Sequence, residues 1–147
     1  WLLEKSVEMG LHSLTLLECA RSERRRLKLD RLVRVMQAAC KQSGKGRLPL
    51  LHGPIPFEQA LEACTSEQKA IGALIDGADS HFLPPLIRGN PKESWSVFIG
   101  PEGDFSESEV SAAQSKGFAL VHLGPHRLRT ETAGLYAVAA FAQRLGG

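Results

Sequence analysis

The stretch from Val97 to Val110 constrains the fold more than any other part of the sequence. It begins with a short apolar run, Val97-Phe98-Ile99, which is typical of a buried strand, and Gly100-Pro101 ends that run abruptly. Ser106 is followed three residues later by Glu109, the pattern of a capping box at the start of a helix. The chain is therefore predicted to pass from a buried strand through a glycine loop directly into a helix.

The predicted loop, residues 100–105, has little side-chain bulk because it contains Gly100 and Gly103, so its backbone can lie directly against a ligand. It lacks both the lysine of a phosphate-binding P-loop and the G-x-G-x-x-G spacing. Glu102 and Asp104 make it acidic. An acidic loop favours a ligand with hydroxyl, ammonium or sulfonium groups over a nucleoside triphosphate. An ordinary strand-to-helix connection remains the alternative.

The composition is that of one soluble globular domain. The chain has 147 residues, of which 43% are hydrophobic and 23% charged. No apolar run is long enough to cross a bilayer, and no signal peptide is visible. Cys19, Cys40 and Cys64 lie too far apart for a zinc site and are odd in number, so we expect a cytoplasmic protein. No carboxylate–histidine cluster has ligand spacing, so we expect no catalytic metal.

A basic cluster precedes the second predicted helix. It is opposed only by Glu23, and its density suits contact with phosphates, although a solvated loop is the alternative. The cluster consists of Arg21, Arg24, Arg25, Arg26 and Lys28.

Strands and helices are predicted to alternate along the chain. Such alternation indicates an α/β fold with a mostly parallel sheet and helices on both faces. We expect strands at 14–19, 47–51, 70–75, 97–99 and 118–123, helices at 1–9, 27–42, 57–64, 106–116 and 130–145, and irregular structure at 81–93, where Pro84, Pro85 and Pro91 occur.

Two glycine-containing loops, 100–105 and 124–129, follow strands and should lie at one edge of the sheet, where the turn after Ile75 completes a pocket. Thr130 is expected to cap the terminal helix. That helix carries small and apolar residues almost all round, which requires burial on more than one side, in the core or against a partner subunit.

Two segments carry a resemblance to a known family. Residues 99–106 (Ile-Gly-Pro-Glu-Gly-Asp-Phe-Ser) and 123–133 (Leu-Gly-Pro-His-Arg-Leu-Arg-Thr-Glu-Thr-Ala) resemble the signature pair of the RsmE-type 16S ribosomal RNA (uracil-N3) methyltransferases of the SPOUT superfamily. The similarity extends upstream to 4–10, 22–24 and 41–45, in the same order. Asp104 stands where the family usually has a third glycine.

The resemblance implies that residues 1–147 form a SPOUT methyltransferase domain whose C-terminal segment makes a deep trefoil knot. It implies S-adenosylmethionine as the cofactor, 16S ribosomal RNA or the small ribosomal subunit as the partner, and a homodimer whose interface borders the site. Family members carry an N-terminal PUA-like RNA-binding domain, which we expect to precede Trp1 and to be absent from this chain.

The resemblance also assigns residues to the site. The residues expected to contact RNA are Arg21, Arg24 and Arg25, of which Arg24 matches the family motif. The residues expected to bind the cofactor, mainly through their backbone groups, are Leu74, Ile75, Gly100, Glu102, Gly103, Leu123, Gly124 and Leu128.

The implied chemistry is attack by uracil N3 on a sulfonium methyl group, and N3 must lose its proton before or during the attack. Glu102 is a candidate general base, and Arg129 a candidate for stabilising the negative charge on the uracil oxygens. Each has an alternative role: Glu102 as an acceptor for loop amides, Arg129 as a phosphate or dimer-interface contact. The target base must be unpaired or flipped out, because N3 lies on its pairing edge.

Two rival functions stay open. An NAD- or ATP-using α/β enzyme is disfavoured by the missing dinucleotide fingerprint and the acidic loop. A non-catalytic RNA-binding module or ribosome assembly factor that keeps the fold is disfavoured by the intact glycine loops.

Overall fold

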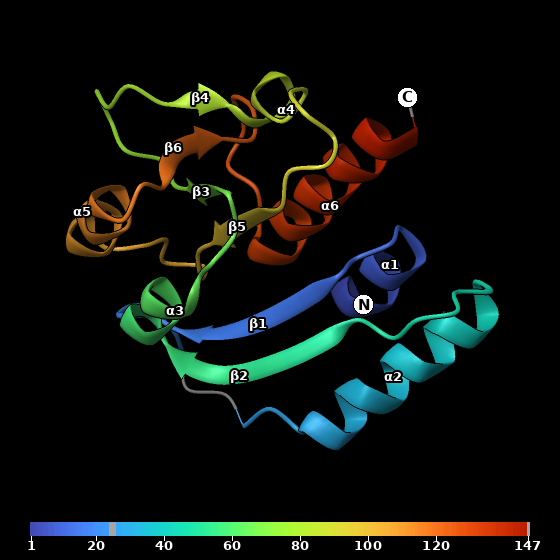
Figure 1. The fold of residues 1–147 in the computed structure, drawn as a ribbon. Helices are drawn as coiled ribbons and strands as arrows, with labels where there is room; N and C mark the ends of the chain where they lie inside the picture. Colours follow the sequence, from blue (N-terminus) through green and yellow to red (C-terminus); the bar gives the residue numbers. More distant parts are fainter. Residues whose placement is uncertain (24–25, 147) are drawn as a thin grey trace.

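In the computed structural model, which describes residues 1–23 and 26–146, the strands form two parallel sheets (Figure 1). The smaller pairs β1 (Ser13–Glu18) with β2 (Leu50–Pro56). The larger has the order β4-β6-β3-β5, with β3 at Gln68–Gly72, β4 at His81–Phe82, β5 at Trp95–Ile99 and β6 at Ala119–His122. The parallel pairing is as predicted, but the strands divide into two sheets rather than forming one.

Helices cover both faces of the larger sheet. Successive residues of a strand point to opposite faces, and Ile71 of β3 packs in one cluster with residues of α3 and α5, whereas Ala70 packs in another with residues of α4 and α6. These helices are α3 (Phe57–Ala63), α4 (Leu83–Leu86), α5 (Glu107–Ser115) and α6 (Thr130–Gly146).

The smaller sheet is covered by α1 (Leu2–Glu8) and α2 (Leu29–Gln42). Leu3 and Val7 of α1 pack against Met36 of α2, and Leu14 of β1 and Leu51 of β2 pack against the same cluster. The amphipathic pattern of residues 27–42 is thus explained: the apolar face of α2 is buried between α1 and the sheet.

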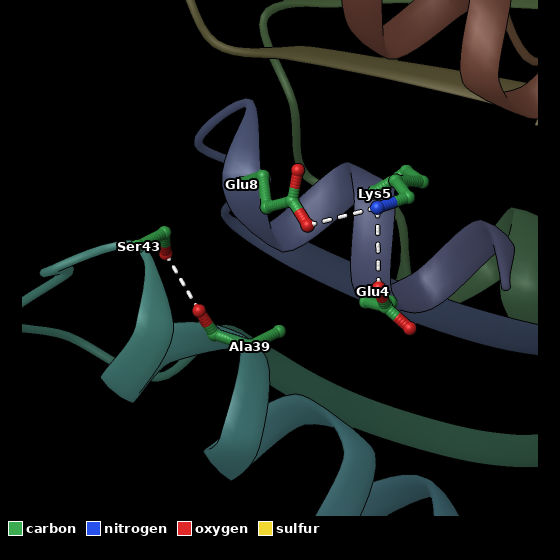
Figure 2. A network of polar contacts seen from close by, with 5 residues as sticks. All are labelled: Glu4, Lys5, Glu8, Ala39 and Ser43. Carbon is green, nitrogen blue, oxygen red and sulfur yellow. Dashed lines mark hydrogen bonds and ion pairs between the residues drawn. The ribbon is translucent and has the colours of Figure 1, made fainter.

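The exposed side of α1 carries a small charge network. Figure 2 shows the Lys5 ammonium between the carboxylates of Glu4 and Glu8, at 3.1 Å from each. These hydrogen bonds, with Glu8 contributing most, raise the pKa of Lys5. At the end of α2 the Ser43 hydroxyl donates to the carbonyl of Ala39 over 2.7 Å. Lys5 is therefore a cation already neutralised by neighbours on its own helix.

Two proline-containing segments differ from the prediction. The strand expected at 47–51 lies at Leu50–Pro56 and includes Pro54. Because β2 pairs only with β1, one of its edges is free, and a residue without an N–H is tolerated there. The segment 81–93, expected to be irregular, contains β4 and α4, since proline is compatible with the first turn of a helix.

The composition of the terminal helix α6 predicted burial on more than one side, but among its described residues only Ala133 and Ala137 are buried and most others are partly exposed. The helix contacts α1, α4 and β5. Gly134 lies so close to α1 that an added Cβ would stand 3.2 Å from the side chain of Leu2. Across residues 1–23 and 26–146, no helix combines the length and apolar character that a transmembrane span requires.

Candidate functional site

Three loops at the carboxyl ends of neighbouring strands β3, β5 and β6 enclose one pocket of about 80 Å³. This is the edge of a parallel sheet at which ligands usually bind. The two glycine loops had been predicted to meet in this way, but the third wall is formed by residues 72–74 at the end of β3 and not by the turn expected after Ile75. The lining residues are Gly72, Ala73, Leu74, Ile99, Gly100, Pro101, Glu102, Asp104, Val121, His122, Leu123, Gly124, His126, Arg127, Leu128, Thr130 and Ala133.

Asp104 determines the shape of the loop after β5. Its φ is 64°, a left-handed conformation that favours glycine and that aspartate tolerates better than most residues. Its backbone N–H donates to the carbonyl of Pro101 over 2.8 Å. Its carboxylate accepts hydrogen bonds from the backbone N–H of Phe105 (2.8 Å) and of Leu74 (3.1 Å). The side chain therefore holds its own loop and links it to the loop after β3.

The helix after this loop begins with the predicted capping box. The Glu109 N–H donates to the Ser106 hydroxyl over 3.2 Å, and the Glu109 carboxylate accepts from the Ser106 N–H over 2.8 Å. The other oxygen of that carboxylate accepts from the N–H of Ala20 at 2.7 Å, just beyond β1. Glu109 is only 5% exposed, so one buried side chain connects the segment after β1 to the start of α5.

Next to this carboxylate lies the thiol of Cys19. Burial raises the pKa of Cys19 to about 11, and the negative charge of Glu109 adds to the effect. A thiol with so high a pKa remains protonated at neutral pH and is a poor nucleophile. Cys19 is therefore part of the packing behind the pocket and not a reactive group.

The loop after β6 closes the pocket from the other side. The Arg127 guanidinium donates to the carbonyl of Glu102 over 3.3 Å. The hydroxyl of Thr130 donates to the carbonyl of Gly100 over 2.8 Å. Thr130 was expected to cap α6, but it is the first residue of that helix, and its side chain joins α6 to the glycine loop instead.

His122 lies at the end of β6 and lines the pocket. Its ring stacks on Phe82 of β4, with centroids 5.4 Å apart and planes at 19°. Its Nδ1 accepts a hydrogen bond from the N–H of Gly124 over 3.3 Å, which requires this nitrogen to be unprotonated. The imidazole therefore orients the start of the loop that follows it.

The residues assigned from the sequence fall into three groups. Six of the proposed cofactor contacts line the pocket: Leu74, Gly100, Glu102, Leu123, Gly124 and Leu128. Ile75, Gly103 and Arg129 are not among the lining residues, although all three lie on the loops that form the pocket. Arg24 and Arg25 lie outside the described residues.

Arg21 and Gly103 contact each other. The Arg21 guanidinium donates to the carbonyl of Gly103 over 3.0 Å, and a Cβ added at Gly103 would stand 3.1 Å from the Cβ of Arg21. Gly103 thus faces the basic segment after β1, and the absence of a side chain at this position lets that segment approach the loop.

Sequence reasoning missed three contributors to the site, namely Asp104, His122 and Arg127. All three lie in or beside the two segments that carried the family resemblance. Asp104 had been noted for its charge and for standing where the family usually has glycine, but its hydrogen bonds to two backbone N–H groups were not foreseen. For His122 and Arg127 no signal existed, because their roles depend on hydrogen bonds between loops that are distant in sequence.

The sequence matches a known domain family and known proteins. Residues 1–142 match the family described as RNA methyltransferase domain. The chain is 28% identical to ribosomal RNA small subunit methyltransferase E of Bacillus subtilis over 152 aligned positions, covering 97% of this chain and 59% of that protein.

Solved structures give the same picture. The crystal structure of a probable rRNA-methyltransferase from Porphyromonas gingivalis superposes with a TM-score of 0.91 at 37% identity, over 99% of this chain and 61% of that one. Ribosomal RNA small subunit methyltransferase E from Neisseria gonorrhoeae, crystallised with bound S-adenosyl methionine, superposes with a TM-score of 0.80 at 33% identity, over 97% and 59%. The chain therefore spans about three-fifths of the length of these relatives.

Proposed function

Because the chain belongs to the RNA methyltransferase domain family, we propose that it transfers a methyl group from S-adenosylmethionine to N3 of a uridine in small-subunit (16S) ribosomal RNA. The observation that carries the proposal is the pocket formed by the loops after β3, β5 and β6. The names of the relatives given above support ribosomal RNA as the substrate, and the one with S-adenosyl methionine bound supports the cofactor.

The charge of the pocket suits this cofactor. A Cβ at Gly100 would stand 3.1 Å from both the Asp104 carboxylate and the Phe105 nitrogen, so a side chain at this position would disturb the loop that lines the pocket. Glu102 and Asp104 place negative charge beside the ligand, which favours a cationic sulfonium over a polyphosphate. We propose that the six lining residues assigned above hold the cofactor, with Ile75 and Gly103 supporting their loops.

The chain's own residues supply positioning and proton removal, and the bound cofactor supplies an electrophilic methyl group. Both oxygens of Asp104 already accept backbone N–H groups. By contrast, no hydrogen bond or ion pair to the Glu102 carboxylate occurs among the described residues. We therefore propose Glu102 as the group that accepts the N3 proton, with most of the rate enhancement coming from orientation of the two reactants.

The cation that stabilises the uracil oxygens has two candidates. Arg129, proposed from the sequence, is exposed and does not line the pocket, whereas Arg127 does. Arg127 is also held beside Glu102 by its hydrogen bond to the Glu102 carbonyl. Removal of each guanidinium in turn separates a role in the reaction from a role in binding RNA phosphates, because only the first lowers the rate at saturating RNA.

The proposal includes a SPOUT-type trefoil knot, a homodimer, a cytoplasmic location and a PUA-like domain preceding the segment in the full protein. The position of β6 between β3 and β4, followed by the link from Thr130 to Gly100, supports the knot. The small pocket supports a dimer, because about 80 Å³ is less than the roughly 300–1,000 Å³ of typical ligand sites. A second subunit would complete the enclosure.

Calorimetric titration of the chain with S-adenosylmethionine, with NAD and ATP as competitors, tests the cofactor. Transfer of radiolabelled methyl groups to unmodified small-subunit ribosomal RNA, followed by identification of the methylated base, tests the reaction. We expect binding of S-adenosylmethionine alone and one labelled uridine carrying the methyl group at N3. Binding of NAD or ATP instead would exclude the proposed function. Cofactor and RNA binding without transfer would favour the non-catalytic RNA-binding module.

A further inference from the structure

Positive charge is concentrated in one part of the sequence. Residues 21–47 contain ten of the eighteen Lys and Arg residues but only two of the sixteen acidic ones. This segment thus has a net charge of +8, and the remainder of the chain has −6. The overall charge of +2 is small, but the charge is distributed very unevenly along the sequence. An uneven distribution of this kind is typical of proteins that bind polyanions.

The structure places much of this charge on one helix face. Arg31, Arg34 and Lys41 of α2 are all exposed. At about 100° per residue, their positions fall within roughly 80° of one another around the helix axis. Figure 1 shows α2 at the outside of the two-stranded sheet. Its apolar residues pack in one cluster with residues of α1. The three cations therefore face solvent in a row.

These cations are not neutralised by the protein. Within residues 1–23 and 26–146, the side chains of Arg31, Arg34 and Lys41 have no hydrogen bond or ion pair. Lys5 on the neighbouring helix is different, because two glutamates surround it (Figure 2). The one acidic residue of α2 is Asp30, in the first turn, where it complements the helix dipole. The row is free to bind an external anion.

The basic segment that contains the row contacts a pocket loop at its start and lines a second cavity at its end. At one end the basic segment begins with Arg21, which is hydrogen-bonded to the pocket loop at Gly103. The helix itself, with 14 residues, is about 21 Å long. At the other end Lys45 and Arg47, together with His12, line a cavity of about 240 Å³ beside the amino ends of β1 and β2.

We propose that the α2 track, defined as Arg31, Arg34 and Lys41 together with Lys45 and Arg47 at the cavity, binds the phosphate backbone of the RNA on one side of the target nucleotide. The inference rests on the proposed function for the identity of the polyanion. A membrane is the less suitable partner, because a helix that binds a bilayer needs a free apolar face, and that of α2 is already buried against α1 and the sheet.

The test compares two double variants that remove the same charge. Arg31→Gln/Arg34→Gln alters the α2 track, and Arg88→Gln/Lys92→Gln removes two exposed cations from the segment after α4. Binding of a uridine-containing single-stranded RNA is measured by fluorescence anisotropy between 50 and 200 mM salt. We expect the track variant to bind on the order of tenfold more weakly and its salt slope to fall by about 1.4, because about 0.7 is lost per phosphate contact in single strands. The control should bind like the unaltered chain.

One further variant and further measurements make each outcome of this test decisive. The charge-conserving Arg34→Lys variant should keep the salt slope, and circular dichroism should show that both double variants remain folded. Equal losses in the track and control variants, an unchanged track variant, or binding to phosphatidylserine vesicles but not RNA would each overturn the inference. Titration with S-adenosylmethionine separates the two proposals: absent cofactor binding with intact track-dependent RNA binding would exclude the methyltransferase and leave the track in place.

Discussion

The Asp104 carboxylate links two of the three pocket loops, because one of its oxygens accepts a hydrogen bond from the backbone N–H of Leu74 at 3.1 Å. The same side chain belongs to a residue in the left-handed region, at φ 64°. A glycine at this position would adopt that conformation without cost but would leave the Leu74 N–H without this acceptor. Compared with glycine, aspartate at position 104 is less suited to the left-handed conformation, but its carboxylate forms a hydrogen bond between the two loops.

Replacing Asp104 tests this relationship. Asp104→Ala removes both hydrogen bonds of the carboxylate and keeps an unfavourable φ, so we expect the free energy of unfolding to fall by about 1–3 kcal/mol. Asp104→Gly removes the same hydrogen bonds without the conformational cost and should be about 1 kcal/mol more stable than the alanine variant. Urea unfolding measures both. Equal stability of the two variants would show that the backbone conformation carries no cost.

Glu109 is predicted to matter through two contacts at once. Glu109→Ala removes the capping box and leaves the N–H of Ala20 without its acceptor, so we expect a loss of about 2–4 kcal/mol in unfolding free energy. Glu107→Ala is the matched control, because Glu107 lies in the same helical turn but is exposed, and it should cost less than about 1 kcal/mol. A similar loss in both variants would argue against the buried bridge.

The two glycines of the loop after β5 should have separable functions. At Gly100 an added Cβ meets the Asp104 carboxylate and the Phe105 nitrogen, so Gly100→Ala should weaken binding of S-adenosylmethionine on the order of tenfold, about 1.4 kcal/mol. At Gly103 an added Cβ meets Arg21 instead, so Gly103→Ala should weaken RNA binding more than cofactor binding. Calorimetry and anisotropy on both variants distinguish the effects, and a greater loss of cofactor affinity in Gly103→Ala would contradict this assignment.

The partly buried Cys19 thiol predicts a pH dependence of stability. Its pKa is about 11 in the folded chain and 9.0 as the reference for an exposed thiol. Between these values the unfolded state has lost the proton and the folded state keeps it, so stability is unaffected below pH 9.0 and falls as the pH rises toward about 11. Cys19→Ala removes this contribution. The difference in urea midpoint between the two chains should therefore change only in alkaline solution, and a constant difference would refute the burial effect.

Local chemistry made part of this molecule predictable. The capping box of Ser106 and Glu109, the glycine loop before it and the convergence of three loops follow from residues close in sequence or from the geometry of parallel strands. The core face of α2 was equally visible, because the spacing of its apolar residues follows the helical period.

What the sequence could not reveal depends on contacts between distant segments. The division into two sheets arises from pairing choices that alternation of strands and helices does not specify. The strand through Pro54 is possible only because β2 lies at an edge, and edges are known only once the pairing is known. Arg127 joined the site through a backbone carbonyl 25 positions away, a partner that carries no signal in the sequence.

The place of β6 in the larger sheet has a consequence for how the protein is made. This strand comes late in the chain yet lies between β3 and β4, and α6, which follows it, packs against α1 at the other end of the sequence. A chain synthesised only as far as β5 therefore lacks the strand that joins β3 to β4 and the loop that forms one wall of the pocket. Fragments that stop before residue 119 would lack nine of the residues that line the pocket, so the pocket depends on segments that are made far apart in time.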